Sequence, residues 1–130
     1  IARETNNPLT IWGSGKPLRE FIYNKDVSKL TEWVLDNYDE DEPIILSTSE
    51  EISIKEVVEI IVELMNFKGE VIYDKNKPDG QFRKPSSNSK IKHYLPNFKF
   101  TPLYDGLKET IEWFESNYSN VRGTKHIHSK

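Results

Sequence analysis

Two polar segments of the chain contain the side chains best suited to bind a polyanion. In the first, Trp12 adjoins a glycine turn and Arg19 follows the turn, next to an apolar Phe-Ile-Tyr run. A guanidinium can pair with two phosphate oxygens, and an indole ring offers a flat face to a base or a sugar. In the second segment, Lys84 follows a Pro-Asp-Gly turn in which the carboxylate of Asp79 can fix the backbone. Together, the two segments could hold a diphosphate.

Each of these features is common by itself. Lys16 and Arg83 extend the set of possible diphosphate contacts, but surface cations of this kind are usually exposed without any ligand. Asp79 could be a turn residue only, and Trp12 could be part of a core. From the residues alone, both interpretations stay open.

Cofactor and metal motifs are weak in this sequence. The turn Gly13-Ser14-Gly15 lacks the third glycine and the following helix of a dinucleotide-binding loop. His126 and His128 have no third ligand nearby, so no metal site is expected. Two Tyr-x-x-x-Lys spacings occur without an accompanying cofactor loop, and we interpret both as chance: Tyr73 with Lys77, and Tyr104 with Lys108.

The elements that must position the candidate residues follow from apolar periodicity, capping residues and turn residues. Strands are predicted at Leu9–Trp12, Leu18–Tyr23, Ile44–Leu46 and Glu70–Asp74. Helices are predicted after a cap at Asp26, after a capping box at Ser53 that ends near Gly69, at Ser89–Leu95, and after a cap at Thr101 through about Tyr118. Trp33 and Trp113 fall on helix faces and are predicted to pack there. The segment between Lys75 and Ser89 is predicted to be a long loop, which in a compact domain is usually functional or disordered.

Length and composition limit the classes of protein. The 130 residues suffice for one domain with a core, and we place that domain at residues 1–118 with a loose tail at 119–130. A net charge of −3 argues against general nucleic-acid affinity, and no apolar run approaches membrane-spanning length. The absence of cysteine excludes disulfides and fits a cytoplasmic location. Because the chain begins with Ile1, we expect it to be a fragment.

The spacing Trp-Gly-x-Gly-x-Pro-x-Arg-x-Phe-Ile-Tyr-x-x-Asp, from Trp12, resembles the sugar-nucleotide-binding half of the extended short-chain dehydrogenases/reductases. The run Lys-Pro-Asp-Gly-x-x-Arg-Lys, from Lys77, is the more specific part. It resembles the branch that epimerises GDP-4-keto-6-deoxymannose at two carbons and reduces it with NADPH to GDP-fucose. The resemblance extends from about Asn7 to Tyr118.

The resemblance implies an α/β substrate-binding domain with three to four helices, from which the Rossmann half is absent. It implies that Trp12, Arg19, Asp79 and Lys84 bind the GDP-sugar. It also implies that NADP and the catalytic residues belong to the missing amino-terminal half, so that this fragment alone is inactive while the full-length enzyme, a homodimer, is active.

Two other interpretations remain open. The chain could be the substrate domain of another nucleotide-sugar epimerase or dehydratase, or a self-standing module that binds a nucleotide sugar or a protein without chemistry. Preference for GDP or UDP would separate them.

Overall fold

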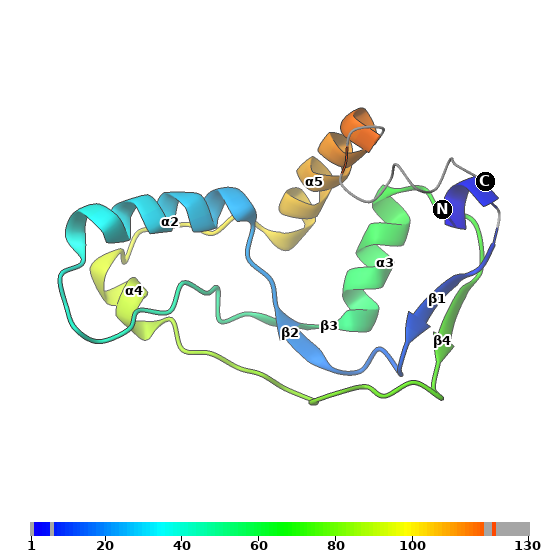
Figure 1. The fold of residues 1–130 in the computed structure, drawn as a ribbon, viewed down its shortest axis with the longest axis horizontal. Helices are drawn as coiled ribbons and strands as arrows, with labels where there is room; N and C mark the ends of the chain where they lie inside the picture. Colours follow the sequence, from blue (N-terminus) through cyan, green and yellow to red (C-terminus); the bar gives the residue numbers. More distant parts are fainter. Residues whose placement is uncertain (1, 6, 119–120, 122–130) are drawn as a thin grey trace.

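The chain folds into five helices and four short strands over residues 2–5, 7–118 and 121, which the computed structural model describes (Figure 1). The mixed α/β class is the one predicted from the sequence. The helices are α1 (Ala2–Thr5), α2 (Asn24–Asn37), α3 (Ile54–Leu64), α4 (Ser89–Tyr94) and α5 (Leu103–Asn117). The strands are β1 (Leu9–Trp12), β2 (Leu18–Glu20), β3 (Glu51–Ser53) and β4 (Val71–Asp74). The predicted tail and its two histidines lie outside the described residues, apart from position 121.

Two separate two-stranded sheets organise the chain. Strands β1 and β4 are parallel, with Leu9 opposite Val71 and Trp12 opposite Asp74. Strands β2 and β3 are antiparallel. Because parallel strands end at the same edge, the glycine turn after β1 and the long loop after β4 leave the sheet side by side.

Helix α3 begins as its sequence predicts. The Ser53 hydroxyl accepts a hydrogen bond from the Glu56 amide at 3.1 Å, and the Glu56 carboxylate accepts one from the Ser53 amide at 3.0 Å. This reciprocal pair satisfies two donors that the first helical turn would otherwise leave open. The predicted end near Gly69 is wrong: the helix stops at Leu64, and Asn66, not glycine, takes the left-handed conformation with φ 49°.

Two predicted helix caps are wrong. Helix α2 starts at Asn24 with Tyr23 at the cap position, so Asp26 lies inside the first turn. Its carboxylate is 2% exposed and accepts hydrogen bonds from the amide and the hydroxyl of Thr101, at 2.7 and 3.1 Å. Pro102, not Thr101, caps α5. A tertiary contact across 75 residues therefore replaces both local caps.

The strand predictions fail where no partner strand is present. Residues 21–23 are outside β2, and Ile44–Leu46 forms no strand, with Ile45 47% exposed. In contrast, Glu51–Ser53 was not predicted as a strand but pairs with β2. An apolar run favours a strand only if the tertiary structure supplies an edge to pair with.

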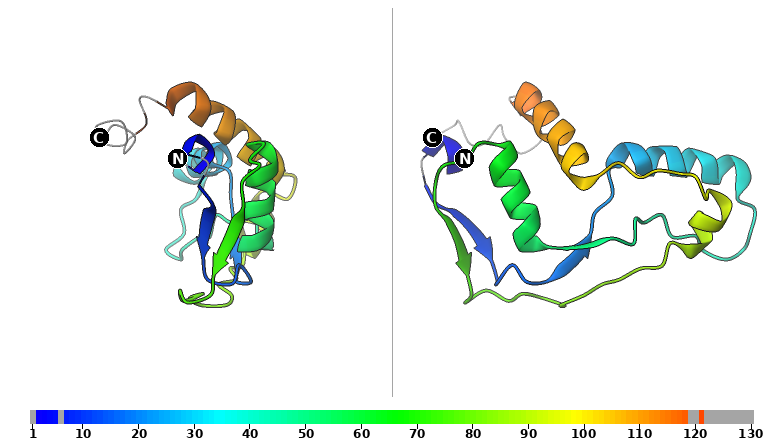
Figure 2. Two further views of the ribbon diagram at one scale, coloured as in Figure 1. Left: turned by 90° about the vertical axis from the view of Figure 1, so that its right-hand side faces the viewer. Right: turned by 180° about the vertical axis from the view of Figure 1, so that it is seen from behind.

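The molecule is elongated, with two ends joined by extended segments (Figures 1 and 2). Helices α2 and α4 lie at one end, and β1, β4 and α3 at the other, with α5 contacting α3. Its accessible surface is 9740 Å², whereas a compact monomer of 15.2 kDa exposes about 7,100 Å². The chain therefore closes on itself less than an independent domain of this size does.

The expected core is correspondingly small. Among the described residues, only three apolar side chains are buried: Leu30, Val57 and Ile91. Several large apolar side chains are instead exposed, including Leu35 (80%), Phe82 (59%) and Trp113 (58%). The prediction that Trp113 packs on a helix face is therefore wrong for the described structure, whereas Trp33 does pack, with its ring 5.4 Å from that of Tyr94.

Candidate functional site

The two segments that carry the candidate residues lie side by side. The segment that follows β4 runs along residues 12–20 and contacts them repeatedly, from Lys77 beside Trp12 to Ser86 beside Glu20. We call residues 12–20 and 74–86 the paired loops. The parallel register of β1 and β4 sets this arrangement, because it starts both loops at one edge.

Asp79 holds the glycine turn. Its two carboxylate oxygens accept hydrogen bonds from the backbone amide and the hydroxyl of Ser14, the latter at 2.7 Å. These bonds from Ser14 hold the pKa of the Asp79 carboxyl below its usual value. A Cβ on Gly13, where φ is +83°, would lie 2.3 Å from Asp79 Oδ1. Only glycine allows this close approach.

The side chain of Arg19 reaches the second of the paired loops, residues 74–86. Its guanidinium donates to the carbonyl of Leu18 at 2.6 Å and to the carbonyl of Gln81 at 2.8 Å. The Leu18 amide also donates to the Phe82 carbonyl at 2.8 Å. A guanidinium has five N–H donors, so these two bonds orient the side chain and leave donors available to an anion.

Trp12 is 71% exposed at the end of β1. The ammonium of Lys77 lies 5.3 Å from the centre of its ring. The interpretation of Trp12 as a core residue is therefore wrong for the described structure. Its ring is available to a flat ligand group and has a cation beside it.

The remaining cations of the paired loops divide into two groups. Arg83 is paired with Glu51, to which its Nε donates at 3.0 and 3.1 Å. Lys16 and Lys84 are exposed, and neither forms an ion pair with any carboxylate of the described residues. Arg83 is thus engaged inside the chain. Lys16 acts electrostatically on Asp79 without forming an ion pair, and Lys84 has no carboxylate partner among the described residues.

One functional feature was missed from the sequence. Glu20, the last residue of β2, accepts hydrogen bonds from the hydroxyl of Ser47 and from the amide and hydroxyl of Ser86, the amide at 2.7 Å. Burial raises the pKa of Glu20, but the hydrogen bonds from the two serines outweigh it, and the pKa lies below the usual value. The alternation of side chains in a strand could have separated Glu20 from Arg19, but its partners could not be inferred.

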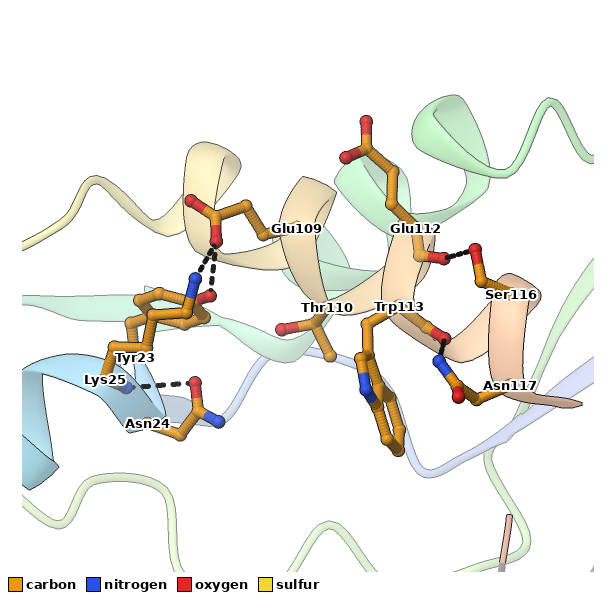
Figure 3. A pocket seen from close by; sticks show the side chains of 9 residues that line it. All are labelled: Tyr23, Asn24, Lys25, Glu109, Thr110, Glu112, Trp113, Ser116 and Asn117. Atoms are coloured by element: carbon orange, nitrogen blue, oxygen red, sulfur yellow. Dashed lines mark hydrogen bonds and ion pairs between the residues drawn. The ribbon is translucent and has the colours of Figure 1, made fainter. Parts of the chain in front are cut away.

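One cavity among the described residues lies away from the paired loops. It has a volume of about 660 Å³ and is lined by residues from the start of α2 and one face of α5, including the exposed Trp113 (Figure 3). At one end, Glu109 accepts hydrogen bonds from Lys25 at 2.6 Å and from Tyr23 at 2.7 Å. Lys25, and then Tyr23, lower the pKa of the Glu109 carboxyl. Its volume alone does not indicate a ligand site, because Glu109, Lys25 and Tyr23 bind one another there and none of the candidate diphosphate-binding residues lines it.

The described residues give no support to a resident metal or a dinucleotide loop. No group of three metal-ligating side chains occurs in the described part of the chain. The glycine turn leads into strand β2, not into a helix, as expected. Tyr104, one of the two spaced tyrosines, donates to Glu63 at 3.3 Å. Within the described ranges, no helix combines the length and the apolar character needed to cross a bilayer.

Comparison with known proteins places this geometry in a family. Residues 1–47 match the model of the NAD dependent epimerase/dehydratase family. GDP-L-fucose synthase from Dictyostelium discoideum is 48% identical over 94% of the chain, and a probable GDP-L-fucose synthase from Drosophila melanogaster is 40% identical over 92%. The crystal structure of a GDP-L-fucose synthetase from Naegleria fowleri bound to NADP superimposes with a TM-score of 0.91, at 41% identity over 93% of the chain.

The fold and the matched motifs therefore assign the chain to the extended short-chain dehydrogenases/reductases, the NAD dependent epimerases and dehydratases. The chain belongs to this family. Within the family, it is homologous to the GDP-L-fucose synthases. It spans 39% and 38% of the length of the two relatives and 38% of the solved structure.

Proposed function

We propose that the chain is the substrate-binding portion of a GDP-L-fucose synthase. In this proposal, the complete enzyme converts GDP-4-keto-6-deoxy-D-mannose to GDP-L-fucose by 3,5-epimerisation and NADPH-dependent 4-reduction. The names of the relatives support the reaction, and the NADP-bound relative supports the cofactor. The single observation that carries the proposal is the pairing of the two candidate loops through the contacts of Asp79 and Arg19.

Four residues share the work of binding. Arg19 and Lys84 attract the diphosphate, since a guanidinium held by two carbonyls presents its other donors and the lysine has no competing carboxylate in the described structure. Trp12 lies against the base or the sugar through its exposed ring. Asp79 fixes the turn through Ser14 and has spare acceptor capacity for ligand hydroxyls, because a carboxylate can accept about four hydrogen bonds.

The chain supplies binding energy, not chemistry. Holding the nucleotide end orients the sugar at a reaction centre built by another part of the enzyme. We place that centre and the NADP site in a Rossmann half, and we expect residues 1–118 alone to be inactive. The large accessible surface and the exposed apolar side chains support packing against such a body. A cytoplasmic homodimer completes the proposal, as the family resemblance implies.

The experiment is a calorimetric titration of the full-length protein that contains this sequence with GDP and with UDP. We expect a clear preference for GDP. Preference for UDP would support the substrate domain of another nucleotide-sugar epimerase or dehydratase, and binding of neither would contradict the proposal.

A pair of variants localises the site. Arg19→Ala should weaken GDP binding by about tenfold or more, since hydrogen bonds to charged groups contribute roughly 1.5–3 kcal/mol. Lys92→Ala removes an exposed cation from α4 and should leave the affinity within about twofold. Equal losses in the two variants would show that only the net charge matters.

A further inference from the structure

Two glutamates face the same stretch of the second paired loop. Glu20 of β2 lies directly opposite Glu51 of β3 in the antiparallel register. Side chains at directly opposed positions lie on the same face of a sheet, where two like charges destabilise the pairing. Each carboxylate is compensated by a donor from the passing loop, Glu20 by Ser86 and Glu51 by Arg83.

The two donor residues, Arg83 and Ser86, lie on either side of Lys84, a candidate diphosphate-binding residue. Arg83 and Ser86 are three residues apart, so the chain between them can span at most about 10 Å. Lys84 lies between them and is exposed, with no ion pair in the described structure. The two attachments therefore limit where the backbone of Lys84 can lie.

The hydrogen bonds from Arg83 and Ser86 outweigh the repulsion between the carboxylates of Glu20 and Glu51. The Glu51 side chain is only 14% exposed and accepts hydrogen bonds from Nε and Nη2 of Arg83. Arg83 lowers the pKa of the Glu51 carboxyl below its usual value, although the charge of Glu20 acts in the opposite direction. Glu20 is further fixed by Ser47, whose hydroxyl also accepts a bond from Ser86 at 2.8 Å. The carboxylates thus stay ionised and hold the loop at two points.

We infer that Glu20 and Glu51 are positioning residues that hold the Arg83–Ser86 stretch so that Lys84 points its ammonium at the diphosphate. The inference rests on the proposed function and adds two residues to its site. Neither glutamate contacts the ligand, because an anion would repel a polyphosphate. Glu20 and Glu51 act through the Arg83–Ser86 stretch. Because their two carboxylates repel each other, β2 and β3 can pair only when this stretch is attached to both.

The test is a double-mutant cycle in the full-length protein, with GDP affinity as the readout. Lys84→Ala alone should weaken binding about tenfold. Glu20→Gln and Glu51→Gln should each weaken binding several-fold when Lys84 is present, and by less than about twofold in the Lys84→Ala background. Such non-additivity is expected only if the glutamates act through Lys84. Glu50→Gln makes the same charge change at an exposed neighbour and should have no effect in either background.

Two further readouts separate positioning from general damage. The KM for the GDP-sugar should rise in the glutamate variants while kcat changes less, because the chemistry lies elsewhere. In Glu20→Gln, an NH2 group replaces the oxygen that accepts from the hydroxyls of Ser47 and Ser86, so the loop is held less firmly and amide exchange at Ser86 should accelerate. Thermal melting shows how far each variant is destabilised.

The outcomes distinguish the inference from the proposed function. If the glutamate variants weaken GDP binding equally in both backgrounds, or in neither, the inference is overturned. The proposed function would still be supported in that case if the wild-type protein binds GDP. A wild-type protein that binds neither GDP nor UDP would contradict both. Coupled losses through Lys84 would support both.

Discussion

The α2–α4 end and the paired loops use the same kinds of side chain for opposite purposes. At the α2–α4 end, the Lys90 ammonium binds Tyr38, Glu40 and Glu42 at 3.0, 3.0 and 3.1 Å. The two carboxylates therefore neutralise its charge within the chain. In the paired loops, Lys84 has no carboxylate partner in the described structure and Trp12 is 71% exposed. A binding site is therefore recognised by the cations and rings that the fold leaves available.

Contacts other than ion pairs hold the paired loops together. Leu18 and Arg19 use carbonyl partners at Phe82 and Gln81, and Ser14 uses Asp79, to hold the paired loops together. The loops are therefore fixed without neutralising most of their cations. At the α2–α4 end, Glu40 is exposed and also accepts hydrogen bonds from Lys90 and Tyr94. The paired loops keep cations without carboxylate partners in the described structure, whereas Lys90 is paired at the α2–α4 end.

The largest effect should come from the α2–α4 end. Leu30 is fully buried, so Leu30→Ala should lower the free energy of unfolding by about 2–5 kcal/mol. GDP affinity of the folded protein should stay unchanged, because no contact of the paired loops is touched. Denaturant unfolding and calorimetry measure the two quantities.

The same helix offers the control. Leu35 is 80% exposed in this chain, so in residues 1–130 alone Leu35→Ala should change the free energy of unfolding by less than about 0.5 kcal/mol. In the full-length protein, where we propose that another body covers the exposed apolar side chains, the same substitution should cost more. An equally small effect in both would contradict packing against this face of α2.

An intermediate effect is expected in the paired loops. Gly13→Ala places a Cβ at 2.3 Å from Asp79 Oδ1, so the Ser14 contacts must open. We expect GDP affinity to fall about tenfold. The left-handed backbone adds a stability loss of about 1–2 kcal/mol. Calorimetric titration of the variant measures the GDP affinity, and denaturant unfolding measures the loss of stability.

Gly80 provides a control that separates backbone strain from the steric clash expected in Gly13→Ala. It also has a left-handed backbone, with φ +73°, but a Cβ there would meet nothing closer than Arg19 Nη2 at 3.9 Å. Gly80→Ala should therefore show a similar strain in stability with a smaller loss of affinity. Equal loss of affinity in the two variants would argue that loop strain, not the contact of Asp79 with Ser14, controls binding.

The sequence predicts what is local. The capping box of Ser53 and Glu56 needs only four consecutive residues, and the helix forms where that pattern predicts it. Trp12, Arg19, Asp79 and Lys84 could be selected from residue chemistry and family resemblance, but their roles remain a proposal. The pairing of their two loops depends on the register of β1 and β4, which the separate motifs do not encode.

The sequence fails where a distant partner decides. Asp26 has the residue type of a helix cap, yet it lies within α2 because Thr101 supplies its donors. Glu20 and Glu51 could not be related in advance, since β3 is three residues long and its pairing with β2 is tertiary. Ile44–Leu46 lacks a partner strand in the described structure, and apolar composition alone cannot supply one.

The smallest expected effect is a difference between the two regions in pH dependence. In the paired loops, the pKa values of Asp79 and Glu20 are lowered from usual values of 3.8 and 4.5. Their stabilisation is therefore fully present above about pH 4.5 and is lost as the pH falls through the lowered values. At the other end, Tyr38 and Glu40 raise the pKa of Lys90 above its usual 10.5. That stabilisation is present below pH 10.5 and is lost as the pH rises through the raised value.

Two single-tryptophan variants of the full-length protein can follow the regions separately. A variant that keeps only Trp12 reports on the paired loops, and one that keeps only Trp33 reports on the α2–α4 end, through its ring contact with Tyr94. We expect the Trp12 emission to change in acid, below pH 4.5. Lys90→Gln should remove the alkaline change of the Trp33 emission that Lys90 causes and leave the acid change of Trp12 in place. Lys92→Gln, on the same helix but exposed, should move neither, and an acid shift of Trp12 in Lys90→Gln would mean that the two regions are not independent.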